Sequence, residues 1–240
     1  MKKWTRVMYQ PNRPLKEGCY VTASKEHIAL SREAAAEGMV LLKNEHKLLP
    51  LKAGSRIALF GKGSFDYVKG GGGSGDVTVS YVHNLYDGFQ MLLDAVSLYE
   101  PLCDFYRNHV NGQYEQGSVP GMTTEPALSA GLLAGASAYT DTAVIVLSRF
   151  SGEGWDRSSI EYNGEYNPET SMPKISGEIF PDGDFYLTKE ESAMIAQVKQ
   201  HFSRIAVVLN IGGIIVPAAM LCAAPLSADA PSPVSALRQE

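Results

Sequence analysis

The chain has 240 residues, 45% of them hydrophobic and 20% charged, and a formal net charge of −5. This length and composition predict one sizeable globular domain or two small ones, and the acidic balance argues against a nucleic-acid-binding protein, which would carry a basic face. Three scattered cysteines form neither a disulfide framework nor a zinc-type pair, so we expect no metal site and a reducing, cytoplasmic setting.

The N-terminal part contains one predicted helix and one predicted strand. Residues 1–23 form an arm without hydrophobic periodicity. Ser24 then offers a helix N-cap, and apolar residues recur behind it at helical spacing, which predicts a helix that ends near Asn44. A short apolar strand follows at 56–61 and runs into a glycine-rich loop at 61–77.

The middle of the chain alternates between clear and ambiguous patterns. Residues 83–100 have a helical pattern that Pro101 is expected to end. Residues 110–135 are rich in Gly, Ser and Ala and stay unassigned. The apolar run at 142–149 predicts a buried strand. A long polar stretch, 157–183, predicts an extended loop, and such loops in compact domains are often functional.

The C-terminal part begins with a helix start signal. Thr188 and Glu191 have the spacing of a capping box. Four apolar residues behind it share one helical face: Met194, Ile195, Val198 and Phe202. The apolar run 205–226 is long enough to span a bilayer, but its glycines and proline favour a buried strand at 204–213, so we expect no membrane association. Residues 216–240 follow no pattern and predict a disordered tail.

Strands that alternate with helices predict an α/β fold, in which a mostly parallel sheet has helices on both faces and is incomplete at the C-terminus. We expect this α/β sandwich domain to occupy residues 24–215. In such sheets ligands bind beyond the carboxyl ends of the strands. The loops that follow the predicted strands at 56–60, 142–148 and 204–210 are therefore the places where a site is expected.

One of these loops, within SRFSGEGWDRSS at residues 148–159, carries unusual side chains for a turn. Glu153 lies between two glycines, where a carboxyl group is placed to donate a proton to a leaving group. Trp155 supplies an apolar wall, which raises the pKa of a carboxyl group, or a surface on which a sugar stacks. We expect Asp156 and Arg157 to fix the turn by pairing with each other or with neighbouring loops. The alternative is a surface turn whose ion pair stabilises little.

The glycine-rich loop at 61–77 also lies at a strand end. It lacks the residue order of a P-loop and the third glycine of a dinucleotide-binding motif, which disfavours a nucleotide site. Its central residues are Gly72, Gly73, Ser74 and Gly75. We interpret it as backbone that approaches a ligand or a facing domain closely, because glycine permits that approach. A flexible surface loop is the alternative.

Six segments of the chain occur in an order that resembles glycoside hydrolase family 3, the β-glucosidase and β-xylosidase group. They are AAAEGMVLLKNEHKLLPL, RIALFGKGS, GGGGSGDV, SRFSGEGWDR, LTKEESAMIAQV and IAVVLNIGG. The resemblance covers about residues 24–215 and implies the α/β sandwich domain of that family.

The resemblance implies a retaining glycosidase that uses two carboxylates, with no cofactor and no metal. It implies that the nucleophilic Asp lies on a (β/α)8 barrel domain and that the acid/base Glu, on a loop of the sandwich domain, matches Glu153. Retention requires the two carboxyl groups about 5–5.5 Å apart, so this loop must reach the barrel. The expected partners are a β-linked oligosaccharide or glycoside and a barrel domain for which these 240 residues leave no room.

Two other functions stay open at this stage. One is a non-catalytic carbohydrate-binding or domain-docking module that uses Trp155 and the glycine-rich loop, and the other is a nucleotide-binding domain. The tail at 216–240 departs from the family pattern, as a frameshift or a truncation would produce. We expect the chain alone to be inactive, since the nucleophile lies elsewhere.

Overall fold

The structure is a computed structural model, and it describes residues 15–20, 24–44, 47–70, 79, 81–92, 95–152, 176–213 and 215. The chain divides into two compact units, with the boundary after Asn44. The predicted tail at 216–240 lies outside the described residues, and the predicted domain boundaries stay a prediction.

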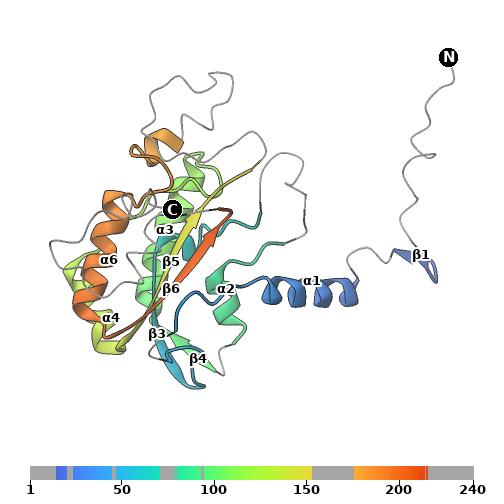
Figure 1. The fold of residues 1–240 in the computed structure, drawn as a ribbon, viewed down its shortest axis with the longest axis horizontal. Helices are drawn as coiled ribbons and strands as arrows, with labels where there is room; N and C mark the ends of the chain where they lie inside the picture. Colours follow the sequence, from blue (N-terminus) through green and yellow to red (C-terminus); the bar gives the residue numbers. More distant parts are fainter. Residues whose placement is uncertain are drawn as a thin grey trace, which may run out of the picture. The chain divides into compact units, whose positions relative to one another are not determined.

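The second unit is built around a parallel sheet of four strands in the order β4-β3-β5-β6 (Figure 1). The strands are β3 (Ser55–Phe60), β4 (Val96–Leu98), β5 (Thr142–Arg149) and β6 (Arg204–Ile211). Every residue of β5 is buried, and β5 pairs with β6 along its whole length. The predicted parallel sheet and its strands near 56, 142 and 204 are therefore confirmed.

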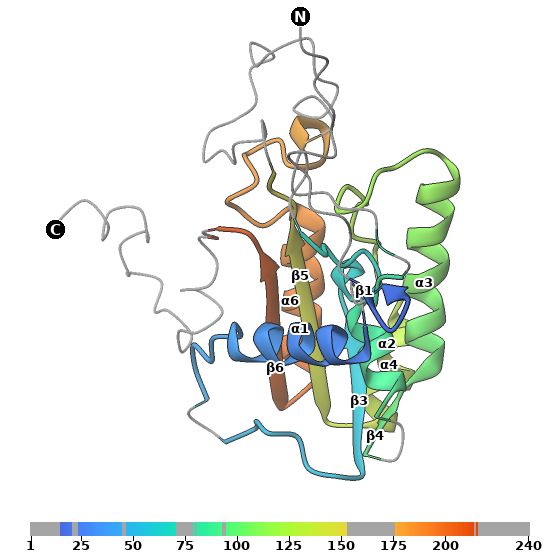
Figure 2. The same ribbon diagram turned by 90° about the vertical axis from the view of Figure 1, so that its right-hand side faces the viewer.

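Helices cover both faces of this sheet, whose strands β6, β5, β3 and β4 lie side by side in Figure 2. Three helices pack on one face: α3 (Glu100–Glu115), α4 (Ala130–Tyr139) and α6 (Lys189–His201). Every second residue of a strand points to this face, and the helices bury these apolar side chains. The short helix α2 (Leu85–Gln90) packs on the opposite face, against β3 and β4. Strands buried on both faces explain the unbroken apolar runs of the sequence.

The segment 83–100 is not the single helix that its pattern predicted. α2 ends at Gln90, β4 follows, and Pro101 lies in the first turn of α3. Pro101 therefore begins a helix instead of ending one, because a first-turn N–H has no partner within the helix and its loss there has no cost. The unassigned residues 110–135 contain the end of α3 and the start of α4.

The capping box predicted at the start of α6 is confirmed. The N–H of Glu191 donates to Oγ1 of Thr188 at 3.1 Å, and the N–H of Thr188 donates to Oε2 of Glu191 at 2.9 Å. The four apolar residues behind it are all buried: Met194, Ile195, Val198 and Phe202. Among the helices that the structure describes, none is long and apolar enough to cross a membrane.

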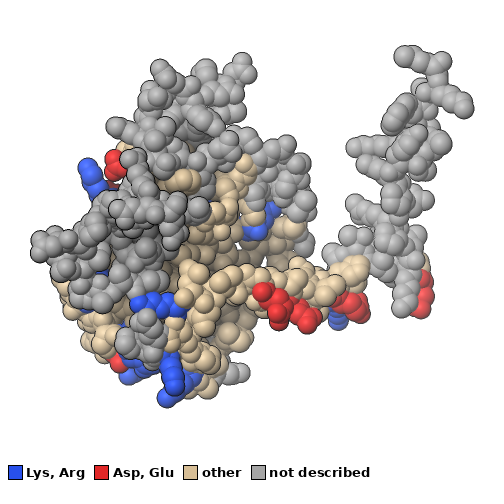
Figure 3. Space-filling view, viewed as in Figure 1, with Lys and Arg blue, Asp and Glu red and all other residues tan. Residues whose placement is uncertain are grey.

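The first unit contains a hairpin of β1 (Leu15–Lys16) and β2 (Cys19–Tyr20) and the helix α1 (Lys25–Glu37). Ser24 caps α1 as predicted, since its side chain accepts a hydrogen bond from the N–H of His27 at 3.4 Å. No residue of α1 is buried, and its acidic side chains are visible along the helix (Figure 3).

The predicted end of this helix was wrong. The pattern placed it near Asn44, whereas α1 ends at Glu37 with Gly38 as its C-cap. Glycine has a low helix propensity, and the β-branched Val40 that follows it is also a weak helix former, so the apolar spacing continued past the point where the backbone leaves the helix.

Gly61, directly after β3, gives a testable constraint on this fold. Its φ is +94°, and a Cβ atom there would overlap the backbone carbonyl oxygen of Val146 in β5. Gly54 also has a positive φ, +79°, but nothing lies within 4 Å of the place its Cβ would take. The two glycines therefore separate the cost of backbone strain from the cost of overlap.

We expect Gly61→Ala to lower the free energy of unfolding by clearly more than Gly54→Ala. Both substitutions place an L side chain at positive φ, which costs about 1–2 kcal/mol. Only Gly61→Ala must also push two strands apart, and overpacking of this kind adds about 1–3 kcal/mol. Urea denaturation of the two variants measures the difference, and equal losses would contradict the close contact between Gly61 and β5.

Candidate functional site

Buried charged groups gather at the carboxyl edge of the sheet, where ligands bind in folds of this class. Lys62 follows β3 and Arg149 ends β5, while Asp66, Glu125 and Glu191 come from neighbouring segments. Their exposed fractions are 3%, 1%, 0%, 7% and 2% in that order. A buried charge is costly unless it is paired and hydrogen-bonded, so the partners of these groups define the geometry of the edge.

Asp66 is the centre of the first cluster. Its carboxylate accepts hydrogen bonds from Nζ of Lys62 at 2.9 Å and from Oγ1 of Thr123 at 2.6 Å. It also accepts from the hydroxyl of Tyr114 and the N–H of Gly121. Burial alone would raise the pKa of Asp66, but the Lys62 ammonium and these hydrogen bonds lower it below its ordinary value. The cluster joins the start of the glycine-rich loop to the segment after α3.

Arg149 is the centre of the second cluster. Its Nη1 and Nη2 donate to the two carboxylate oxygens of Glu191, at 2.7 and 2.6 Å. Its Nε donates to the carbonyl of Asp184 at 3.0 Å, and Nη2 also donates to the carbonyl of Tyr186 at 2.8 Å. The guanidinium carbon lies 4.5 Å from the ring centroid of Phe180. One side chain thus connects the end of β5 with the segment 180–187 and with the first turn of α6.

Glu125 lies beside both clusters. Its Oε2 accepts a hydrogen bond from the N–H of Lys62 at 2.8 Å, and its Oε1 accepts one from the hydroxyl of Tyr106 at 2.9 Å. Burial disfavours the charged form of Glu125 and raises its pKa to about 7, more than these two hydrogen bonds and the charge of Lys62 lower it, and the charge of Glu191 adds a smaller upward contribution. Glu125 is therefore a carboxyl group that changes its protonation state near neutral pH.

Asn210 binds the third strand end to the glycine-rich segment. Its Oδ1 accepts a hydrogen bond from the N–H of Val68 at 2.7 Å, and its Nδ2 donates to the carbonyl of Val68 at 3.1 Å. The hydroxyl of Ser148 donates to the carbonyl of Asp66 at 3.2 Å. The expectations from the sequence did not include this role of Asn210. A lone amide at the carboxyl end of a buried strand was the available signal.

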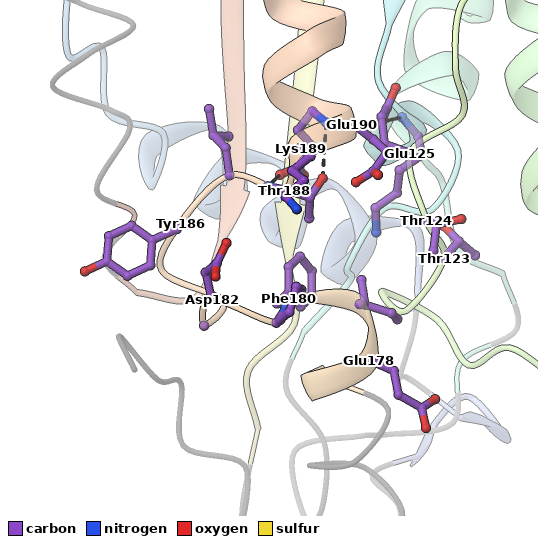
Figure 4. A pocket seen from close by; sticks show the side chains of 16 residues that line it. Thr123, Thr124, Glu125, Glu178, Phe180, Asp182, Tyr186, Thr188, Lys189 and Glu190 are labelled. Carbon is purple, nitrogen blue, oxygen red and sulfur yellow. Dashed lines mark hydrogen bonds between the residues drawn. The ribbon is translucent and has the colours of Figure 1, made fainter. Parts of the chain in front are cut away.

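A cavity of about 440 Å³ opens beside these groups, between the loop after α3 and the N-terminal turn of α6 (Figure 4). Its lining consists of Lys62 and residues 123–125, 178–183 and 186–191. Hydroxyl, carboxyl and aromatic groups dominate this lining, a combination that suits a polar organic molecule. Within the described ranges, no group of three or more His, Cys, Asp or Glu side chains is placed to hold a metal ion.

The site residues predicted from the sequence all lie outside the described residues. They are Glu153, Trp155, Asp156, Arg157, Gly72, Gly73, Ser74 and Gly75. Their roles stay predictions. The structure does place the chain just before each group, since Asp66 precedes Gly72 by six residues and Arg149 precedes Glu153 by four. Each of the two groups of predicted site residues therefore follows, within a few residues, a buried ion-pair residue at the carboxyl edge: Asp66 before Gly72 and Arg149 before Glu153.

Comparisons with known proteins give a consistent result. A family model described as the Glycosyl hydrolase family 3 C-terminal domain matches residues 39–232. The chain is 53% identical over 217 residues to Beta-glucosidase A of Butyrivibrio fibrisolvens and 30% identical over 197 residues to a Beta-glucosidase of Ruminococcus albus. These matches cover 90% and 79% of this chain but 26% and 18% of the relatives, so the chain spans about a quarter or less of their length.

Solved structures agree with the sequence matches. Beta-glucosidase 3B from Thermotoga neapolitana, in complex with alpha-D-glucose, superimposes with a TM-score of 0.65 and 31% identity over 80% of this chain and 25% of that chain. A beta-glucosidase from Paenibacillus barengoltzii gives a TM-score of 0.63 and 28% identity, over 80% of this chain and 19% of that one.

The raised pKa of Glu125 predicts how stability depends on pH. A carboxyl group with a higher pKa in the folded state holds its proton more tightly there than in the unfolded chain, where the ordinary pKa is 4.5. The resulting stabilisation is complete below pH 4.5 and is lost as the pH rises through about 7. At about 1.4 kcal/mol per pH unit, the loss is on the order of 3 kcal/mol.

We therefore expect the unfolding free energy of the wild type, relative to that of Glu125→Gln, to fall between pH 4.5 and about 7. Glutamine keeps the size of the side chain and stays neutral, so other titrating groups cancel in the difference. Asp66, whose pKa is lowered from 3.8, acts in the opposite sense and only in more acidic solution. Urea denaturation across this range provides the measurement, and parallel curves would rule out the perturbed carboxyl group.

Proposed function

Because the chain belongs to glycosyl hydrolase family 3, through the C-terminal domain of that family, we propose that it supplies the general acid/base of a retaining β-glycosidase. This membership confirms the resemblance predicted from the sequence. The observation that carries the proposal is the 53% identity, over 90% of the chain, to a protein named Beta-glucosidase A.

In the proposed mechanism Glu153 acts twice. Its protonated carboxyl group donates a proton to the glycosidic oxygen while a carboxylate nucleophile, on a barrel domain outside these residues, attacks the anomeric carbon. Ionised Glu153 then accepts a proton from the water that cleaves the glycosyl–enzyme bond. The proposed substrate is a glycoside with a terminal β-linked glucose, a choice supported by the names of the relatives and by the glucose complex of the Thermotoga neapolitana enzyme.

The carboxyl edge supports this placement of the acid. The segment that contains Glu153 leaves the sheet where two further strand ends and a polar cavity lie. An acid carried on such a loop can extend beyond its own domain toward a sugar that a second domain holds. Trp155 would supply the apolar surface that keeps the acid protonated until a substrate binds.

We expect a polypeptide of these 240 residues alone to show no turnover of an aryl β-glucoside, because the nucleophile is contributed by another domain. Hydrolysis is followed by release of the aryl group, with a full-length relative as the positive control. Robust turnover by the purified chain would contradict the division of roles. Binding of glucose or cellobiose without turnover, seen as a change in tryptophan fluorescence, would favour a carbohydrate-binding module instead.

The acid role itself is tested by Glu153→Ala in a full-length relative that carries the same loop. We expect kcat/KM to fall about 10²–10⁴-fold for a disaccharide, which needs protonation of its leaving group, and far less for a dinitrophenyl glucoside, which does not. Azide should restore turnover of the activated substrate, because an anionic nucleophile needs no general base.

An exposed acid at the end of α3 provides the matched control, since Glu115→Ala removes a carboxylate that lies on the surface. This variant should leave both substrates unaffected. Equal losses on the two substrates in Glu153→Ala would remove Glu153 from the acid role.

A further inference from the structure

We infer that the buried ion pair of Arg149 and Glu191 is a positioning device that fixes the segment carrying Glu153. The inference rests on the proposed role of Glu153 as the general acid. Neither Arg149 nor Glu191 takes part in proton transfer in this proposal, because both are buried, at 1% and 2% exposure, and each is bonded to the other.

The first argument is the place of Arg149 in the chain. It is the last residue of β5, and it lies opposite Ile211 in the ladder with β6. Glu153 follows four residues later, so at most about 14 Å of extended chain separates the two Cα atoms. Whatever fixes Arg149 therefore fixes the point from which the acid loop starts.

The second argument is that one guanidinium is bonded to the chain on both sides of Glu153. Arg149 precedes Glu153 by four residues, and Asp184 and Tyr186 follow it by 31 and 33 residues. On that return side, the carbonyls of Asp184 and Tyr186 accept hydrogen bonds from Arg149 at 3.0 and 2.8 Å. A side chain just before Glu153 is thus bonded directly to backbone that follows Glu153 in the sequence.

The third argument comes from the energetics of buried ion pairs. Removing two charges from water costs about as much as their attraction returns, so an apolar pair of similar volume would stabilise the fold equally well or better. An apolar pair has no preferred direction, however, whereas two parallel N–H···O bonds fix the plane of the guanidinium. What Arg149 and Glu191 contribute beyond an apolar pair is orientation.

Glu191 is itself held in place by local structure. Its Oε2 accepts a hydrogen bond from the N–H of Thr188 at 2.9 Å in the capping box, in addition to the bond from Arg149. The capping box therefore holds the carboxylate at the first turn of α6 independently of its bonds to the guanidinium. A rigid helix, a rigid strand end and the return segment are joined at one point.

This arrangement has a consequence for rate. A displacement of about 1 Å of a catalytic group can lower the rate about 10²-fold. Loosening the ion pair should therefore weaken the steps that need the acid, while steps that do not need it continue. A purely structural role predicts something different, namely a loss of folded enzyme that affects every substrate equally.

The test uses Glu191→Gln in a full-length relative with the same loop. We expect kcat/KM for a disaccharide to fall about 10–10²-fold, with the activated dinitrophenyl glucoside changed by less than about threefold. Arg149→Lys is the second variant, since it keeps the positive charge and loses the fork of two parallel donors. Arg107→Lys, at a surface ion pair with Asp104, is the matched control and should change neither substrate.

Combining each variant with Glu153→Ala completes the test. Because the positioning residues act through Glu153, adding Glu191→Gln to Glu153→Ala should cause no further loss on the disaccharide. Equal losses on both substrates for Glu191→Gln and Arg149→Lys, or additive losses in the double variant, would overturn this inference and leave the proposed function intact. If Glu153→Ala shows no selectivity between the substrates, the proposed function fails and the inference with it.

Discussion

A guanidinium removed from water must have every N–H group directed at an oxygen atom, and this requirement at Arg149 organises the carboxyl edge of the sheet. One oxygen is the carbonyl of the adjacent Ser148, and the others come from Glu191 and from the carbonyls of Asp184 and Tyr186, which belong to segments far from β5 in the sequence. The charge therefore brings together the strand end, the return segment and the helix α6. None of these parts can move without leaving a buried donor unpaired, which costs more than the bond itself contributes.

The same constraint operates at the end of β3, with a different outcome for Glu125. Lys62 and Asp66 are four residues apart and satisfy each other locally, so Asp66 stays ionised. Glu125 receives only two neutral hydrogen bonds and lies within the field of Glu191. Burial disfavours the charged form of Glu125 more than these bonds can offset, and the nearby charge of Glu191 adds to the effect, so its pKa is raised.

The sequence predicted the parts of this fold that depend on local patterns. The runs at 142–149 and 204–213 were identified because both are almost wholly apolar, although only β5 is fully buried and β6 is partly exposed, and the start of α6 because a capping box is a signal within four residues. α3 was missed because a proline marks a helix start as well as a helix end, and only the strand before it decides between the two.

The buried charges could not be predicted, because their partners are distant in sequence. Arg149 and Glu191 are 42 residues apart, and Lys62 and Glu125 are 63 apart. The sequence did predict that Glu191 caps α6, because that interaction is with Thr188, three residues away. The pairing with Arg149 depends on β5 and α6 being neighbours, and that information lies in the packing and not in any window of the sequence.

A flexible loop and a rigid anchor are complementary requirements for an acid that works on a sugar held by another domain. Random-coil scaling gives a free tether of four residues a span of about 10–12 Å, which is wide compared with the separation of about 5–5.5 Å between the two carboxyl groups of a retaining glycosidase. In the proposed mechanism, fixing the chain at Arg149, and at Asp184 and Tyr186 through the same guanidinium, would reduce the volume available to Glu153. In the same proposal, the glycines on either side of Glu153 in the sequence would permit the loop to extend, and the ion pair would fix the point from which it extends.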